Sequence, residues 1–147
     1  MSKINIFYAD DDDDDLIFFN DAVESAKDNS NELVKLHIHK NGENLLKSIK
    51  ENKPQNGVVF LDINMHRKSG FQFLQEIRSE PSINEFPVII YSTSSNKSDI
   101  DMSLNLGANF YAIKPHTFGD LIKMIQNVMN INWNNHKADV NNFLLIK

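Results

Sequence analysis

The chain has 147 residues, 41% hydrophobic and 24% charged, which suits one globular domain with a substantial core. A net charge of −5 argues against nucleic-acid binding, and the absence of cysteine excludes disulfides, thiolate chemistry and cysteine zinc sites. The sequence lacks a signal-peptide pattern and any apolar run near the roughly 18–20 residues of a membrane span, so we expect a cytoplasmic protein.

Apolar runs without helical spacing alternate with amphipathic segments along the chain. In order, we expect a strand over 4–9, a helix over 14–26, a strand over 33–39, a short helix around 45–49 that ends at 52–54, a strand over 57–61, a helix around 71–77, a strand over 87–91, a helix around 100–107, a strand over 109–113 and a helix over 118–129. The order βαβαβαβαβα predicts an α/β fold, with a five-stranded parallel sheet covered by helices on both faces.

Six consecutive aspartates, Asp10–Asp15, lie between the first strand and the first helix. Neighbouring carboxylates about 6 Å apart repel by roughly 0.7 kcal/mol per pair even in water, so a run inside the fold needs a reason. We divide it. Asp10 and Asp11 are interpreted as part of a metal site. Asp12–Asp15 are expected to face water in the first helical turn, where the helix dipole favours negative charge.

Four predicted strands end in a residue of chemical interest. The first ends in Asp10-Asp11, the third in Asp62, the fourth in Ser92-Thr93 and the fifth in Lys114-Pro115. Ligands of open parallel sheets bind at the carboxyl ends of the strands, so these side chains should meet at one edge. Each alone is a weak signal, since an aspartate after a strand is usually a helix cap, but together they predict a site.

The three carboxylates of Asp10, Asp11 and Asp62 would resist joint ionisation when crowded together, and a bound divalent cation removes the conflict. Oxygen ligands without nearby His or Cys suit Mg²⁺, which also accepts phosphate oxygens as ligands. A carboxylate nucleophile with Mg²⁺, the hydroxyl of Ser92 and the ammonium of Lys114 is the set of groups needed to move a phosphoryl group.

At this point the chain resembles the receiver domain of two-component response regulators, over about residues 3–130. The acidic pair after the first strand matches, and so do LDINMHRKSG at 61–70, IIYSTSS at 89–95 and YAIKP at 111–115. The resemblance implies a flavodoxin-like, doubly wound (βα)5 fold with strand order 2-1-3-4-5. We take residues 1–131 as the receiver domain and 132–147 as a C-terminal extension. The apolar residues near its end, Phe143–Ile146, favour packing of this extension on the domain over a role as a partner-binding peptide.

The resemblance assigns roles to individual residues. Asp62 becomes the phosphorylated aspartate, and Lys114 the lysine that contacts the phosphate. Mg²⁺, for which Mn²⁺ can substitute, would be held by the two aspartates of the acidic pair, by Asp62 and by the backbone carbonyl of Asn64. Ser92 and Tyr111 occupy the switch positions, and Pro115 is expected to follow a cis peptide bond.

The resemblance further implies a stand-alone response regulator rather than an enzyme with turnover. A histidine kinase or a histidine phosphotransfer protein would supply the phosphoryl group. Output would pass to a downstream protein through the face formed by the fourth helix, fifth strand and fifth helix. Residues 130–147 supply neither the length nor the basic charge of a DNA-binding domain, so neither nucleic acid nor a membrane is an expected partner.

Two other classes of protein share parts of this pattern. A haloacid-dehalogenase-type phosphatase would use Asp10 as nucleophile, but the sequence has no later acidic pair, and this reading leaves residues 61–70 unexplained. A calcium loop of the EF-hand type is rejected, because Asp15 stands where it needs glycine. His66, at a position where many receivers have proline, and the alternating pair His37 and His39 are interpreted as structural or surface residues.

Overall fold

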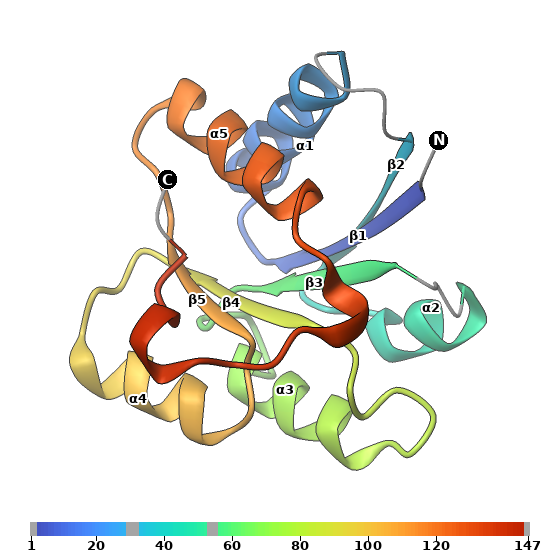
Figure 1. The fold of residues 1–147 in the computed structure, drawn as a ribbon, viewed down its shortest axis with the longest axis vertical. Helices are drawn as coiled ribbons and strands as arrows, with labels where there is room; N and C mark the ends of the chain where they lie inside the picture. The colour runs from blue at the N-terminus through green and yellow to red at the C-terminus, as the bar shows by residue number, and fades with distance from the viewer. Residues whose placement is uncertain (1–2, 29–32, 53–55, 146–147) are drawn as a thin grey trace.

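Five parallel strands form the centre of the fold (Figure 1). They are β1 (Lys3–Asp10), β2 (Leu33–Lys40), β3 (Gly57–Leu61), β4 (Val88–Ser92) and β5 (Phe110–Ile113), and they lie in the order β2-β1-β3-β4-β5. The structure is a computed structural model that describes residues 3–28, 33–52 and 56–145. Pro54, expected to follow the second helix, and the last two residues of the chain lie outside these ranges. The predicted fold class and strand order are confirmed.

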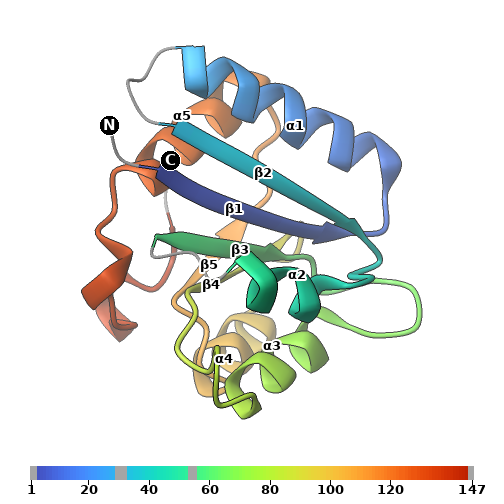
Figure 2. The ribbon, with the colours of Figure 1, turned by 90° about the vertical axis from the view of Figure 1, so that its right-hand side faces the viewer.

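Helices cover both faces of the sheet, as Figure 2 shows edge-on. α1 (Asp13–Asp28) and α5 (Phe118–Met129) lie on one face, and α2 (Leu45–Asn52), α3 (Gly70–Ser79) and α4 (Lys97–Asn105) lie on the other. Because side chains alternate along a strand, Tyr8 of β1 is buried with the α1/α5 layer while Phe7 is buried on the opposite face. None of the helices in the described ranges is long and apolar enough to cross a membrane.

Most element boundaries lie within a few residues of the prediction, and the differences have local causes. β4 begins at Val88 rather than at Pro87, whose missing N–H cannot join a ladder. β5 begins at Phe110, and the preceding Asn109 is bound to β4 twice: its N–H donates to the Val88 carbonyl at 2.8 Å, and its side-chain oxygen accepts from the Val88 N–H at 2.9 Å. β4 extends to Ser92, so this predicted site residue is the last residue of its strand.

The segment after α5 folds back across the β5 edge of the sheet (Figure 1). It contains two short 3-10 helices, Trp133–Asn135 and Val140–Asn142. Trp133 is buried with the α1/α5 layer, whereas Phe143 is buried on the opposite face of the sheet. The C-terminal segment therefore passes from one hydrophobic layer to the other around the edge strand.

Backbone pairing fixes this C-terminal segment to β5. The Tyr111 N–H donates to the Phe143 carbonyl at 3.0 Å, and the Leu145 N–H donates to the Tyr111 carbonyl at 2.8 Å. The two bonds form a parallel bridge between Tyr111 and Leu144. An open edge strand invites pairing with other chains, so the segment protects β5 as well as extending the core.

Replacing Phe143 by alanine tests how firmly the segment is held. Phe143 is 4% exposed, whereas Val140 in the same segment is 70% exposed. We expect Phe143→Ala to lower the free energy of unfolding by about 3 kcal/mol, the cost of removing a buried aromatic ring. Val140→Ala should change it by less than about 0.5 kcal/mol. Urea denaturation measures both, and equal, small changes would show that Phe143 does not anchor the segment.

Candidate functional site

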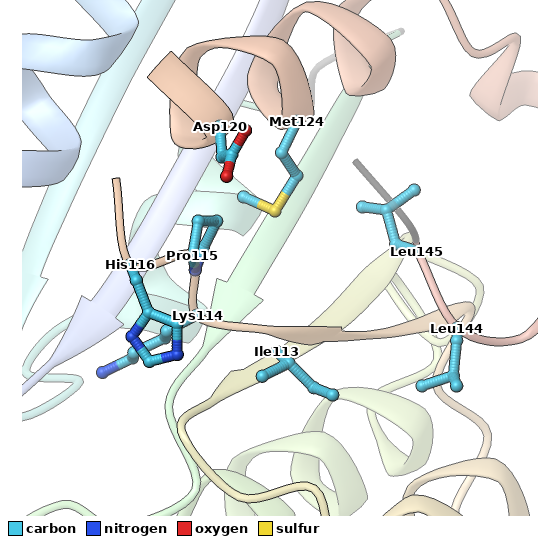
Figure 3. A pocket seen from close by; sticks show the side chains of 8 residues that line it. All are labelled: Ile113, Lys114, Pro115, His116, Asp120, Met124, Leu144 and Leu145. Atoms are coloured by element: carbon cyan, nitrogen blue, oxygen red, sulfur yellow. The ribbon is translucent and has the colours of Figure 1, made fainter. Parts of the chain in front are cut away.

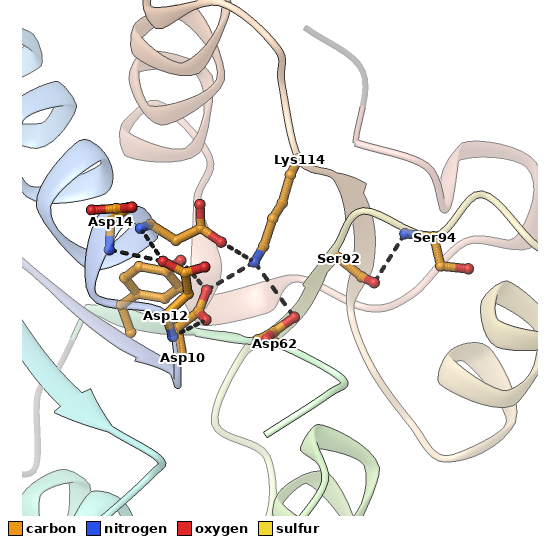
Figure 4. Close-up of polar contacts among 9 residues, drawn as sticks. Asp10, Asp12, Asp14, Asp62, Ser92, Ser94 and Lys114 are labelled. Carbon is orange, nitrogen blue, oxygen red and sulfur yellow. Dashed lines mark hydrogen bonds and ion pairs between the residues drawn. The ribbon is translucent and has the colours of Figure 1, made fainter. Parts of the chain in front are cut away.

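The strand register brings the predicted polar residues to one edge of the sheet. Ala9 pairs with Leu61 and Ser92 with Ile113, so Asp10, Asp62 and Lys114 follow at neighbouring carboxyl ends. Figure 4 shows the Lys114 side chain reaching toward Asp10 and Asp62 from the β5 side. Lys114 contacts both Asp10 and Asp62, so these three groups gather at a single edge as expected.

Three carboxylates form the acidic group at this edge. Asp10, Asp11 and Asp62 each offer an oxygen, and these oxygens lie within 4.8 Å of one another. Asp10 and Asp62 are buried while Asp11 is exposed, so the group opens to solvent on one side. An all-oxygen donor set of this kind fits a hard divalent cation that keeps some of its waters. Asn64 lies in the exposed loop two residues after Asp62, and its carbonyl remains a predicted ligand.

Asp62 is held in place by backbone contacts. Its N–H donates to the Ala9 carbonyl at 3.0 Å, and the α3 N-terminus packs against its carbonyl at Gly70. A Cβ on Gly70 would lie 2.3 Å from the Asp62 carbonyl oxygen, so only glycine permits this approach. The Ser69 side chain caps α3 in a capping box with Gln72, which the sequence analysis did not identify.

Burial raises the pKa of Asp62 to about 7, and the negative charges of Asp10 and Asp11 act in the same direction, against the opposing charge of Lys114. The carboxyl group is therefore hard to ionise without a further cation. Strongly shifted carboxyl groups of this kind are concentrated at functional sites.

Lys114 bridges the carboxylates. Its Nζ donates to Asp10 Oδ2 at 2.9 Å and to Asp15 Oδ2 at 2.9 Å, and it lies 3.5 Å from Asp62 Oδ1. Burial alone would lower the pKa of Lys114, but its hydrogen bonds to Asp10 and Asp15 and the charge of Asp62 raise it above its ordinary value. The ammonium is therefore a fixed positive charge at this edge.

Asp10 is the most constrained carboxylate. It accepts hydrogen bonds from the Tyr8 hydroxyl, from the Asp12 N–H at 3.1 Å and from Lys114. Burial would raise the pKa of Asp10, but the bonds from Tyr8 and Lys114 outweigh it and lower the pKa. Sequence reasoning missed Tyr8, because a tyrosine within an apolar strand reads as a core residue.

The rest of the acidic run divides in a way that only partly matches the prediction. Asp12 accepts from the N–H groups of Asp14 and Asp15 at 2.8 and 3.2 Å and so caps α1. Asp13 forms an ion pair with Lys40 at 2.8 Å, and Asp14 is exposed. Asp15 lies in the first turn of α1 and is partly exposed, as predicted, but its carboxylate also contacts the Lys114 ammonium, which the sequence did not predict.

The two predicted switch residues are linked through the loop after β4. Ser92 is buried, and its Oγ accepts from the Ser94 N–H at 3.1 Å. Tyr111 is fully buried, and its hydroxyl donates to the Ser94 carbonyl at 2.7 Å. Ser94, which the sequence analysis did not single out, thus connects the hydroxyl near the acidic group with the aromatic ring on β5.

The expectation of a cis bond before Pro115 is wrong. The structure contains no cis peptide bond within its described residues, and these include Lys114 and Pro115. The trans isomer is intrinsically favoured before proline by about 0.5–1 kcal/mol. Here the Lys114 N–H donates to the Ser92 carbonyl at 2.8 Å, which continues the strand pairing up to the proline.

Pro115 lines a hollow of about 260 Å³ between β5, α5 and the C-terminal segment (Figure 3).

The histidines behave as structural or surface residues. The His37 ring stacks on Phe7 with centroids 4.4 Å apart, and its Nε2 lies 3.0 Å from the Asn5 side-chain oxygen. His39 is near the same phenyl ring, at 6.3 Å, and His66 is exposed. Among the residues that the structure describes, no group suited to a metal ion includes a histidine.

Fold and site together define a doubly wound α/β protein with a group of carboxylates and a lysine at the carboxyl ends of its strands. The chain matches the response regulator receiver domain over residues 6–126, and it belongs to this family of two-component signalling proteins.

Relatives and solved structures agree with this assignment. The chain is 36% identical over 78 residues to response regulator Rcp1 of Synechocystis sp., a match that covers 53% of this chain and 53% of that protein. It is 29% identical over 75 residues to chemotaxis protein CheY1 of Helicobacter pylori, covering 51% of this chain and 60% of the relative. The matched segments thus span about half of each of these two relatives.

Solved structures match over more of the chain. The Mn(2+)-bound form of response regulator Rcp1 superposes with a TM-score of 0.71 at 25% identity, covering 92% of this chain and 99% of that one. Response regulator RPA3017 of R. palustris gives a TM-score of 0.75 at 23% identity, with coverage of 92% and 99%, which supports the fold alone.

The pKa of Asp62 predicts that its charge destabilises the metal-free protein. Since this pKa is about 7 in the native state and about 4 when unfolded, the native state binds more protons between these values. Stability therefore decreases as the pH rises through this window. Without metal, we expect the free energy of unfolding of Asp62→Asn to be about 1–3 kcal/mol higher than that of the native protein near pH 8. Near pH 5 the difference should be smaller.

Urea denaturation in the presence of a chelator measures this difference. Asp14→Asn is the matched control, since it removes an exposed aspartate from the same acidic region and should change stability by less than about 0.5 kcal/mol. If Asp62→Asn is no more stable than the native protein near pH 8, the ionised Asp62 carboxylate does not destabilise the native state.

Proposed function

We propose that the protein is a response regulator in which Asp62 accepts a phosphoryl group from a histidine kinase or histidine phosphotransfer protein. The observation that carries this proposal is the buried Asp62 carboxylate, 3.5 Å from the Lys114 ammonium and beside two further carboxylates. This arrangement offers a nucleophilic oxygen, a cation for a phosphoryl oxygen and ligands for a second cation. Family membership favours the same conclusion.

The reaction would transfer the phosphoryl group from a phosphohistidine nitrogen to an Asp62 oxygen. The P–N bond breaks as the P–O bond forms, and the released histidine takes up a proton. Asp10, Asp11, Asp62 and the Asn64 carbonyl would hold the divalent cation, with Mg²⁺ suited to their oxygen atoms and Mn²⁺ as a substitute. When bound, that ion keeps Asp62 ionised and neutralises charge on the phosphoryl oxygens.

The chain's own residues would then respond to the new charge. Lys114 pairs with a phosphoryl oxygen, and the Ser92 hydroxyl turns from the Ser94 N–H to donate a hydrogen bond to another. Because Ser94 also accepts from the Tyr111 hydroxyl, movement of this loop changes the surroundings of Tyr111. A local change of charge thereby biases a two-state element on the β4–β5 side. Water attack on the acyl phosphate resets the protein.

Output would pass through the face formed by α4, β5 and α5. In this protein the β5 edge is paired with the C-terminal segment, so a downstream protein would meet the two helices and this segment rather than an open strand. The net charge of −5 favours a protein partner over nucleic acid. We also expect the protein to act in the cytoplasm, where phosphorelay partners would reach it.

Peptide mapping after incubation with acetyl phosphate tests the proposal. The acyl phosphate is trapped by borohydride reduction before digestion, with and without Mg²⁺. We expect Mg²⁺-dependent modification of Asp62 that Asp62→Asn abolishes. Lys114→Ala should fold normally and weaken the response to phosphorylation, because the phosphoryl oxygens lose their cation.

The same experiment separates the alternatives. Modification of Asp10 with steady release of phosphate would instead indicate a phosphatase. Complete lack of modification would make the chain a binding module with a receiver fold. A Lys114→Ala protein that responds to phosphorylation as strongly as the native protein would contradict the role given to Lys114.

A further inference from the structure

Asp15 contacts the site without belonging to its acidic group. It lies on α1, and its Oδ2 accepts a hydrogen bond from Lys114 Nζ at 2.9 Å. The three carboxylates whose oxygens lie within 4.8 Å of one another are those of Asp10, Asp11 and Asp62. Asp15 is therefore not one of the three clustered carboxylates, but it contacts Lys114 directly.

Asp10 has two competing partners. Its Oδ2 accepts from both the Lys114 ammonium and the Tyr8 hydroxyl, yet Asp10 is also a proposed metal ligand. A divalent cation at this carboxylate would take up its negative charge and repel the ammonium. If Asp10 were the only anchor of Lys114, metal binding would drive the lysine away from the place where the phosphoryl group arrives.

We propose that Asp15 is a positioning residue, which keeps the Lys114 ammonium beside Asp62 when Asp10 binds the metal ion. The inference rests on the metal site of the proposed function. With Asp15 present, Lys114 keeps one of its two hydrogen-bonded carboxylate partners on metal binding. Without Asp15, only the longer 3.5 Å contact with Asp62, itself a proposed metal ligand, would remain.

The position of Asp15 suits this role. Its N–H donates to the Asp12 side chain at 3.2 Å, within the capped first turn of α1, and the next residue, Leu16, is buried in the core. The carboxylate is therefore carried by a fixed element rather than by a loop. Its side chain is 41% exposed, so it keeps part of its hydration.

The geometry also leaves Lys114 free to act. An ammonium has three N–H donors, and two of them are used by Asp10 and Asp15. The distance of 3.5 Å to Asp62 Oδ1 marks an ion pair on the remaining side. A phosphoryl oxygen on Asp62 would lie on that side, so holding Lys114 through Asp15 does not consume the donor that the phosphate needs.

Mg²⁺ binding to the unphosphorylated protein tests the proposal. Isothermal titration calorimetry compares the native protein with Asp15→Asn and with Asp14→Asn, a control that removes the same charge from the adjacent, exposed position. We expect Asp15→Asn to weaken Mg²⁺ binding roughly 2- to 5-fold more than Asp14→Asn does, the range for a partly exposed ion pair. Asp15→Glu should recover part of the loss.

The same pair of changes in a Lys114→Ala background shows whether Asp15 acts through the lysine. There Asp15→Asn and Asp14→Asn should alter the Mg²⁺ dissociation constant equally. NMR of lysine labelled with ¹³C and ¹⁵N provides a second readout in the Mg²⁺-saturated protein. The Lys114 side chain should be restrained in the native protein and as mobile as an exposed lysine in Asp15→Asn.

Two results would overturn the proposal: equal effects of Asp15→Asn and Asp14→Asn in the native background, or a difference between them that persists without Lys114. Absence of Mg²⁺ binding by the native protein would overturn it as well. No phosphodonor is used, so these outcomes are independent of whether Asp62 is phosphorylated, which peptide mapping decides separately.

Discussion

Three carboxylates and one ammonium lie at the carboxyl edge of the sheet, and this imbalance of charge governs the site. Asp10, Asp11 and Asp62 lie within reach of one another, and Lys114 is the cation that contacts two of them. Asp10 is satisfied by its hydrogen bonds, so the excess negative charge falls on Asp62, whose pKa is raised. The fold thus holds the Asp62 carboxyl in surroundings that disfavour its ionised form, and a bound cation would relieve this cost.

The charged edge is connected to the opposite end of β5 by short contacts. Ser92 and Tyr111 both bind Ser94, and the backbone of Tyr111 is bonded on both sides by the C-terminal segment. In the proposed switch, movement of Tyr111 would act against a paired strand and against a segment whose Phe143 is buried. Packed interfaces of this kind favour discrete states over gradual deformation, so the segment would help to define the two proposed states as well as covering an edge.

Much of the fold and the site was predictable, because both depend on local patterns. Apolar runs and amphipathic periodicity define strands and helices, and the parallel topology places Asp10, Asp62 and Lys114 at one edge. The remaining features depend on distant contacts that leave no local pattern. The bond between Asp15 and Lys114 spans 99 residues, and nothing distinguishes Asp15 from the five aspartates before it. The pairing of Phe143 and Leu145 with β5 follows from packing, and the isomer of the Pro115 bond was wrongly inferred from a motif.

The run of six aspartates is tolerated because the structure gives its members different partners. Asp10 receives the Tyr8 hydroxyl and Lys114, Asp12 caps α1, Asp13 pairs with Lys40, and Asp15 returns to Lys114. Only Asp11 and Asp14 remain exposed without such a partner among the described contacts. The end of a strand and the first turn of a helix point successive side chains in different directions, which separates charges that are adjacent in sequence. The same turn that spreads the repulsion also places one carboxylate, Asp15, against the lysine on which the proposed chemistry depends.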